Sequence, residues 1–370
     1  MIGVKNIELS TQIGSSETSG TNRLTITVYD SAGRAQAVGK QVARGGEGTV
    51  YQLKDKAMDH VVIKIYHNQQ KAAQVCEKIT AMVSCRNEFN NPWLCWPRAT
   101  IHNKSGSFIG YAMRKAEGHI LFRLLISQYR KRYFPDWNRL TVARLAGKIL
   151  SQFNALHRKG VLIGDINTRN IMVDRANLKA YFIDADSFQF QTAEKPYPCE
   201  VGTADYTAPE LHRGKLSFSK IRRTVSHENF AVAVLLFQMF MDGRHPFDRV
   251  NGATMQENII SGAFPYGEFQ SKNGNTRNEK RVFAKIPPGE WYRRWKAFPY
   301  LIKSSFLRTF IDGHNNSSKR VSVDKWLAEM NKYISMMERG WIPKNWILND
   351  KEMNRKYMGK KELQTRGEHL

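Results

Sequence analysis

The alternation of apolar and polar residues predicts that the first third of the chain is built mainly from β-strands. The expected strands or strand edges are residues 24–29, 42–53, 61–66, 93–97 and 108–113. One amphipathic helix is expected among them, over residues 69–83. Its apolar side is formed by Ala72, Val75, Ile79 and Met82. The pattern breaks at residues 114–119, which we take as the boundary of this β-rich part.

Helical spacing dominates the sequence after residue 119. A strongly amphipathic helix is expected over residues 140–157, and another over residues 323–337. The longest apolar run, residues 230–241, is interrupted by Gln238 and is too short to span a bilayer, so it predicts a buried helix. We therefore expect no membrane span.

The candidate chemistry is concentrated between residues 161 and 210. Two apolar runs each deliver an aspartate at the edge of a strand, Asp165 and Asp184, and Asn170 lies five residues after the first. One carboxylate with a nearby amide can orient a hydroxyl, and a second carboxylate can hold a divalent metal on a phosphate. A single aspartate is often only a turn cap, so the argument depends on the ordered set.

A glycine cluster precedes this stretch, at the tip of the hairpin expected over residues 42–53. Gly45, Gly46 and Gly48 lack a Cβ, so the backbone there can approach phosphates closely. The following strand carries Lys64 between apolar residues, and a lysine facing inward needs an anionic partner. Glu77, on the helix over residues 69–83, is one candidate for that partner. Glu88 is a second candidate, although the chain is expected to have left the helix there.

Composition narrows the function only slightly. Lys and Arg number 57 against 33 Asp and Glu, which gives a net charge of +24 that attracts nucleotides, nucleic acid, acidic proteins or anionic lipid without choosing among them. We prefer a solvated basic face to a nucleic-acid groove over residues 250–300, because no stacking aromatic pattern accompanies the charges. Four cysteines without a CxxC pair indicate a reducing, cytoplasmic setting. A zinc site from Cys85, Cys95 and His102 fits no ligand spacing.

In their order and spacing, these landmarks resemble the eukaryotic-type protein kinase family over about residues 42–327. More narrowly, they are similar to a bacterial subfamily of atypical Ser/Thr kinases, through Ile163-Gly164-Asp165 and Asp184-Ala185-Asp186. The resemblance implies an α+β, bilobal, protein-kinase-like fold with a small β-rich N-lobe and a larger α-helical C-lobe. The domains implied are a partly mobile extension (1–39), the N-lobe (40–116), the C-lobe (117–340) and a charged tail (341–370).

The resemblance also implies roles for individual residues. Gly45, Gly46, Gly48 and Val50 would bind ATP, Lys64 would hold its phosphates, and Glu77 would orient Lys64. Asp165 would position the substrate hydroxyl and accept its proton. Asn170 and Asp184 would hold Mg²⁺, with Mn²⁺ as the alternative metal. Thr203 would pack beside Asp165, and Glu210, in Ala208-Pro209-Glu210, would pair with Arg320.

The sequence departs from the family pattern at several positions. Gly164 replaces the arginine that receives an activation-loop phosphate in many kinases, so activity is not expected to depend on a phosphate docked there. Asn167 replaces the usual lysine that steadies the transferred phosphoryl, and Asp186 replaces a glycine. Glu228 stands where an aspartate usually opens the long core helix, and Ala43 replaces the first glycine of the loop.

We expect a protein Ser/Thr kinase that uses ATP and Mg²⁺ and phosphorylates itself or a protein substrate, which could present an acidic surface. Nucleic acid is a less favoured partner. The first alternative is a pseudokinase that binds nucleotide and signals by conformation, in view of Gly164, Asn167 and Asp186. The second is a kinase of a small molecule or lipid, which the peptide-positioning motif over residues 202–210 disfavours.

Overall fold

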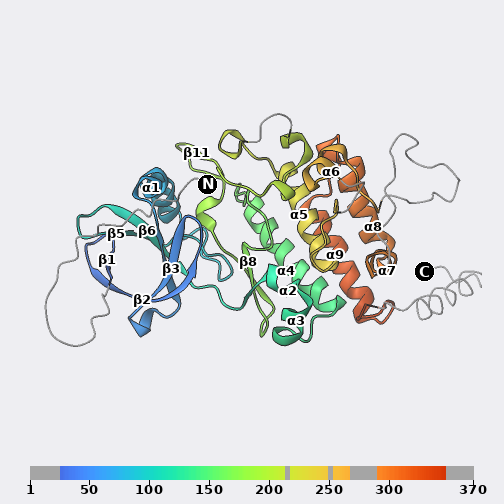
Figure 1. Cartoon of the computed structure of the whole chain (residues 1–370), viewed down its shortest axis with the longest axis horizontal. Helices are drawn as coiled ribbons and strands as arrows, with labels where there is room; N and C mark the ends of the chain where they lie inside the picture. Colours follow the sequence, from blue (N-terminus) through green and yellow to red (C-terminus); the bar gives the residue numbers. More distant parts are fainter. Residues whose placement is uncertain (1–25, 213–216, 249–252, 267–289, 347–370) are drawn as a thin grey trace, which may run out of the picture.

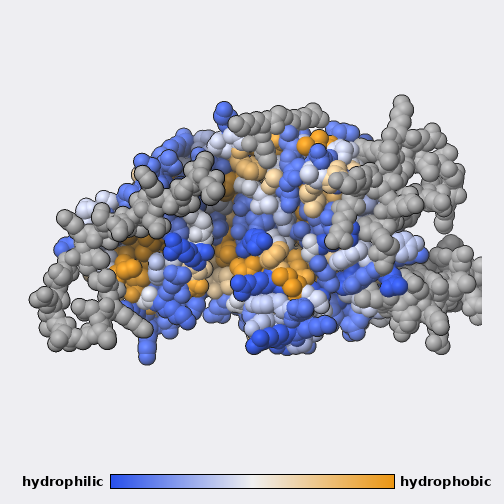
Figure 2. Space-filling model, in the orientation of Figure 1, coloured by the Kyte–Doolittle hydropathy of each residue, from blue (hydrophilic) through white to orange (hydrophobic). Residues whose placement is uncertain are grey.

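The computed structural model describes residues 26–212, 217–248, 253–266 and 290–346. Two lobes are visible, with the strands β1–β6 and helix α1 in one and most of the helices in the other (Figure 1). This is the expected α+β bilobal arrangement. Figure 2 shows that hydrophilic residues cover most of the same face, whereas hydrophobic ones gather on the β-rich lobe and near the middle of the molecule.

The β-rich lobe is a closed antiparallel barrel with the strand order β1-β2-β3-β4-β6-β5. The strands are β1 Thr27–Tyr29, β2 Ala35–Arg44, β3 Gly48–Leu53, β4 Val61–Tyr66, β5 Ala99–His102 and β6 Phe108–Arg114. Successive side chains point to opposite faces of a strand, so Val28 and Ile63 are fully buried in the barrel interior. β1 and the first half of β2 belong to this barrel, which therefore reaches further toward the N-terminus than the boundary expected at residue 40.

Helix α1, Gln69–Ser84, packs on the outside of the barrel against β5 and β6. It begins after Asn68, whose side chain accepts hydrogen bonds from two backbone amides of the first turn. Ala72, Ile79 and Met82 are buried beneath it, as the apolar spacing predicted, and Val75 is partly buried. The larger side chains of Ile79 and Met82 each stabilise the fold by about 2 kcal/mol through burial.

The helical lobe is organised around α5, Val225–Phe240, whose residues from Glu228 to Phe237 are all buried. The expected helices at 140–157 and 323–337 correspond to α4, Arg139–His157, and α9, Val323–Glu338, which pack against each other. The remaining helices are α2 Leu121–Leu124, α3 Ser127–Tyr133, α6 Met255–Ser261, α7 Glu290–Ala297 and α8 Tyr300–Leu307. Across the described ranges, every helix is too short or too polar to traverse a bilayer.

Two small sheets lie between the barrel and the helices and carry the candidate chemistry. The first has the order β7-β8-β9, from His119–Ile120, Ile171–Asp174 and Lys179–Phe182. The second is the hairpin of β10 Phe190–Gln191 and β11 Pro196–Tyr197. Asp165 precedes β8 and Asp184 follows β9, so the antiparallel pairing of these two strands brings both aspartates to the same end of the sheet.

The strand or strand edge expected over residues 93–97 is a loop with one isolated bridge, between Leu94 and Phe182. Pro92 and Pro97 bracket the segment and lack the backbone N–H that a ladder requires, which limits pairing. The segment instead joins the barrel to β9, because Phe182 donates a backbone hydrogen bond to Trp93 and accepts one from Cys95. The expected arm at residues 10–22, the basic residues between 272 and 281, and the tail from 351 lie outside the described residues.

Candidate active site

The side chains of Asn170 and Thr203 hold the two carboxylate oxygens of Asp165. Thr203 Oγ1 donates to Asp165 Oδ1 at 2.8 Å, and Asn170 Nδ2 donates to Asp165 Oδ2 at 3.0 Å. Asn170 Nδ2 also lies 3.0 Å from the backbone carbonyl of Asp165, which closes the loop on itself. Three residues singled out from the sequence therefore meet, although Thr203 is 38 positions away from Asp165.

The loop that carries Asp165 is hydrogen-bonded to Glu228, which is buried near the start of α5. Glu228 Oε1 accepts a 2.6 Å hydrogen bond from the backbone amide of Gly164, and its Oε2 lies 2.7 Å from His157 Nε2. Gly164 adopts φ +73°, and a Cβ there would fall 2.6 Å from both Cβ and Sγ of Cys199. The absence of a side chain at this position therefore lets the Asp165 loop and the segment around Cys199 pack in contact.

The buried ammonium of Lys64 is held by two aspartates that follow β9. Lys64 Nζ lies 3.0 Å from Asp184 Oδ1 and 2.8 Å from Asp186 Oδ2. Burial alone would raise the pKa of Asp186, but the Lys64 charge and three hydrogen bonds outweigh burial and lower it. Burial alone would lower the pKa of Lys64, yet the two carboxylates raise it above its ordinary value.

The expected ion pair between Lys64 and Glu77 is wrong. Glu77 forms its ion pair with Lys195 and lies 3.5 Å from the hydroxyl of Tyr197, and its side chain is 67% exposed. Residues two apart on a helix are separated by about 200° around its axis. Glu77 therefore points away from the side on which Ile79 packs against the barrel. The helical spacing of Ala72, Val75, Ile79 and Met82 in the sequence could already have shown that Glu77 lies on the opposite side of this helix.

The glycine-rich tip lies between β2 and β3, next to Lys64. Gly45 donates a backbone hydrogen bond of 2.9 Å to the carbonyl of Gly48, which tightens the turn. A Cβ at Gly48 would fall 2.7 Å from the carbonyl oxygen of Ile65, whereas one at Gly46 would meet nothing within 4 Å. Val50 is paired directly with Lys64 across β3 and β4. The open backbone at Gly46, together with the approach of Gly48 to the Lys64 side chain, is an arrangement that suits a phosphate.

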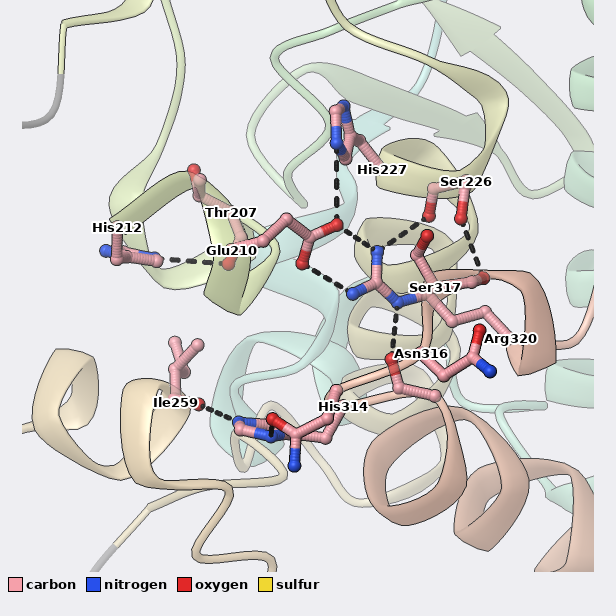
Figure 3. Close-up of polar contacts among 12 residues, drawn as sticks. Thr207, Glu210, His212, Ser226, His227, Ile259, His314, Asn316, Ser317 and Arg320 are labelled. Carbon is pink, nitrogen blue, oxygen red and sulfur yellow. Dashed lines mark hydrogen bonds and ion pairs between the residues drawn. The ribbon is translucent and has the colours of Figure 1, made fainter.

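The expected pair of Glu210 and Arg320 is confirmed. Arg320 Nη1 and Nη2 lie 2.7 and 2.5 Å from Oε1 and Oε2 of Glu210, in the bidentate geometry that suits a guanidinium and a carboxylate. Figure 3 shows the two side chains facing each other, with Ser226 and His227 beside them. Arg320 also donates to the backbone carbonyls of Gly313 and Ser226, so the pair ties residues 208–210 to the core of the helical lobe.

Comparison with known proteins agrees with this geometry. The model of the protein kinase domain matches residues 37–330. The chain belongs to the protein kinase family. Protein kinase YegI of Escherichia coli O157:H7 is 30% identical to this kinase over 313 residues, which cover 82% of this chain and 46% of YegI.

Two further relatives are informative. YegI of Escherichia coli strain K12 is 32% identical over 258 residues, covering 67% of this chain and 39% of the relative. Serine/threonine-protein kinase PKH3 of Eremothecium gossypii is 24% identical over 234 residues, covering 60% of this chain and 30% of the relative. This kinase therefore spans less than half the length of the two bacterial proteins.

The residues of this kinase fit a nucleotide-bound Mg²⁺. The amide nitrogen of Asn170 donates to Asp165, so its amide oxygen is the atom that would bind a metal. The backbone amide of Ile183 donates to the carbonyl of Asn170 at 3.1 Å, so the neighbouring residue Asp184 lies close to Asn170. The side chain of Asp184 is half exposed. Within the described residues no group of three His, Cys, Asp or Glu is arranged for a metal. Such a small set of protein ligands is usual for Mg²⁺, which fills its other coordination positions with water and phosphate oxygens.

Arg223 was not singled out from the sequence. It holds the segment around Cys199, which packs against Gly164, the position where many kinases have an arginine. Arg223 is buried, and its Nη1 and Nη2 donate to the backbone carbonyls of Cys199 and Val201, each at 2.6 Å. Its guanidinium also lies over the ring of Phe218. Nothing in the local pattern marks Arg223, because its partners are backbone atoms more than twenty residues earlier in the chain.

Proposed function

We propose that this kinase is an active, ATP-dependent Ser/Thr protein kinase, which transfers the γ-phosphate of ATP to protein hydroxyls and phosphorylates itself. The observation that supports this most directly is the pair of hydrogen bonds, from Thr203 and Asn170, that holds the carboxylate of Asp165. A carboxylate fixed at both oxygens is ready to align a hydroxyl and accept its proton, and such general-base assistance contributes about 10²–10⁴-fold to a rate.

The other residues align and neutralise the phosphates. Lys64 holds the α- and β-phosphates, with the glycine tip at residues 45–48 above them. Asp184 and Asn170 would hold Mg²⁺, which would supply charge neutralisation on the transferred group. Alignment and charge neutralisation account for most of the acceleration in phosphoryl transfer, and this set of residues carries the groups for both.

Ser/Thr specificity is supported by Thr203, which has the place of the threonine typical of that class, and by relatives whose names include Serine/threonine-protein kinase. The acceptor is a protein, as the kinase family implies, and the net charge of +24 favours an acceptor with an acidic surface. Four free cysteines agree with a reducing, cytoplasmic setting.

A labelling assay tests the proposal. The wild-type chain, incubated with γ-labelled ATP and Mg²⁺, should label itself or a generic protein substrate on serine and threonine, as identified by mass spectrometry. Asp165→Asn should lower the rate by about 10²–10⁴-fold. Asp59→Asn, an exchange of the same kind at an exposed position, should leave the rate unchanged. Equal labelling by wild type and Asp165→Asn would contradict the assignment.

A nucleotide-binding scaffold without turnover is the second candidate, and Asn167 is the observation that favours it. Its amide nitrogen lies 3.2 Å from Thr203 Oγ1 and 3.3 Å from the carbonyl of Asp165, and its amide oxygen accepts from the amide of Arg169. The side chain is therefore committed inside the loop and does not replace the lysine that steadies the phosphoryl group in the family. Saturable ATP binding with no labelling of any protein would favour this candidate.

A further inference from the structure

Lys64 is held in this kinase by a carboxylate from an unexpected element. We propose that Asp186 is the positioning residue for Lys64, in place of a carboxylate from helix α1, so that the phosphate-binding lysine is oriented without an ion pair to that helix. The inference rests on the proposed function, because it assigns to Lys64 the binding of nucleotide phosphates.

The carboxylate of Asp186 is immobilised by three donors. Its Oδ2 accepts from Lys64 Nζ at 2.8 Å and from the hydroxyl of Tyr66 at 2.7 Å. Its Oδ1 accepts from the hydroxyl of Tyr111 at 2.9 Å. The side chain of Asp186 is only 6% exposed, so turning it away would leave buried polar groups without partners.

The barrel supplies all three donors from one of its faces. Lys64 and Tyr66 are two positions apart on β4, so their side chains point the same way. Tyr111 on β6 is paired directly with Lys64 across the two strands. The register of β4 and β6 therefore places all three hydrogen-bond donors around Asp186.

Asp184 and Asp186 lie in different environments, and we assign them different roles. Asp184 makes one contact with Lys64, at 3.0 Å, and its side chain is 51% exposed, so it can turn to a metal ion. Asp184 also holds φ +59°, a left-handed conformation that is rare for a residue with a side chain. Asp186 has both oxygens occupied. Asp184 is therefore the metal residue, and Asp186 keeps Lys64 in place when Asp184 leaves it.

The charged side chains of Glu77 and Lys78, in the middle of helix α1, have partners other than Lys64. Glu77 pairs with Lys195, and Lys78 Nζ donates to the backbone carbonyl of Pro198 at 2.9 Å. Both partners belong to the segment between β10 and Cys199. Removing the Glu77 carboxylate would break its contact with Lys195 and leave the pair of Lys64 and Asp186 intact.

Calorimetric binding of ADP, with and without Mg²⁺, tests this division. Asp186→Asn keeps the shape of the side chain and removes its charge, and it should weaken ADP binding at least tenfold even without metal. Asp184→Asn should leave metal-free binding within about threefold and abolish the gain in affinity that Mg²⁺ gives. Glu77→Gln, the matched exchange on α1, should bind ADP as the wild type does under both conditions.

The outcomes separate the inference from the proposed function. If the wild type binds no ADP, the proposed function fails. If it binds ADP and Asp186→Asn binds equally well without metal, or if Glu77→Gln is weakened as much as Asp186→Asn, the inference is overturned. Should Asp186→Asn not fold, Tyr66→Phe combined with Tyr111→Phe removes two of the three donors and keeps the charge. This variant should weaken metal-free binding by about threefold or more, and unaltered binding would overturn the inference.

Discussion

The guanidinium of Arg223 donates a 2.6 Å hydrogen bond to the backbone carbonyl of Cys199, and this contact needs no phosphate. Together with the bond to Val201, it fixes the segment that packs against Gly164. In many kinases an arginine at the position of Gly164 receives a phosphate from this segment. Here the link is made directly between Arg223 and the backbone, which agrees with the expectation that activity does not require a docked phosphate.

We therefore expect Arg223→Met to lower kcat by about tenfold, because the segment loses two charge-assisted hydrogen bonds. Phosphatase treatment of the wild type should change kcat less than twofold. Arg222→Met, which removes an exposed arginine beside it, is the matched control and should retain wild-type kcat. A loss of rate on dephosphorylation as large as that of Arg223→Met would show that a phosphate is needed after all.

Gly164→Ala should destabilise the fold by about 2–4 kcal/mol. The added Cβ would lie 2.6 Å from Cβ and Sγ of Cys199, and alanine at φ +73° is strained as well. Gly160→Ala is the control, because Gly160 has φ +69° but nothing within 4 Å of an added Cβ, so only the backbone cost of about 1 kcal/mol applies. Urea unfolding measures the loss of unfolding free energy in both variants. Equal losses would mean that the contact with Cys199 is easily relieved.

Arg320→Met should lower the free energy of unfolding by about 3 kcal/mol, since it leaves Glu210 without its bidentate partner. Arg158, whose pair with Asp324 is 3.6 Å long and whose side chain is 74% exposed, provides the comparison. Arg158→Met should cost no more than about 0.5 kcal/mol. Denaturant titration of both variants decides the matter, and similar costs would mean that the Glu210 pair contributes no more than a surface contact.

His245 should make the fold sensitive to mild acid. Burial inside the lobe lowers the pKa of His245 to about 4 from an ordinary 6.5, and this effect outweighs the hydrogen bond between Nε2 and the carbonyl of Asp205, which acts to raise the pKa. The unfolded chain binds a proton near pH 6.5 while the folded chain does not. Stability is therefore complete above pH 6.5 and falls as the pH is lowered toward 4, by up to about 3 kcal/mol.

Urea unfolding between pH 7.5 and 4.5 checks this. His245→Gln has no ring to protonate, so its stability should fall less steeply with pH than that of the wild type. His60→Gln, at an exposed position, should follow the wild-type curve. If wild type and His245→Gln show the same slope, His245 is not the group responsible.

Several elements could be predicted because their signals are local. The strand expected over residues 61–66 is β4, Val61–Tyr66, and the helix expected over residues 69–83 is α1, Gln69–Ser84. Alternation and helical spacing report which side of an element is buried, and that is settled within a few residues. The segment at residues 93–97 was misjudged, because its apolar residues serve a junction between the barrel and β9 rather than a strand.

The sequence by itself determined the order of the chemical groups, from the glycine tip and Lys64 through Asp165, Asn170 and Asp184, and with it the kinase family. Only the tertiary structure decided which carboxylate meets Lys64. Glu77 was the expected partner, yet the packing of α1 turns Glu77 outward, while the pairing of β4 with β6 directs Lys64 and Tyr111 onto Asp186. Helical periodicity could have shown that Glu77 faces outward. It carries no information about which other carboxylate meets Lys64, because that depends on how distant elements are registered against one another.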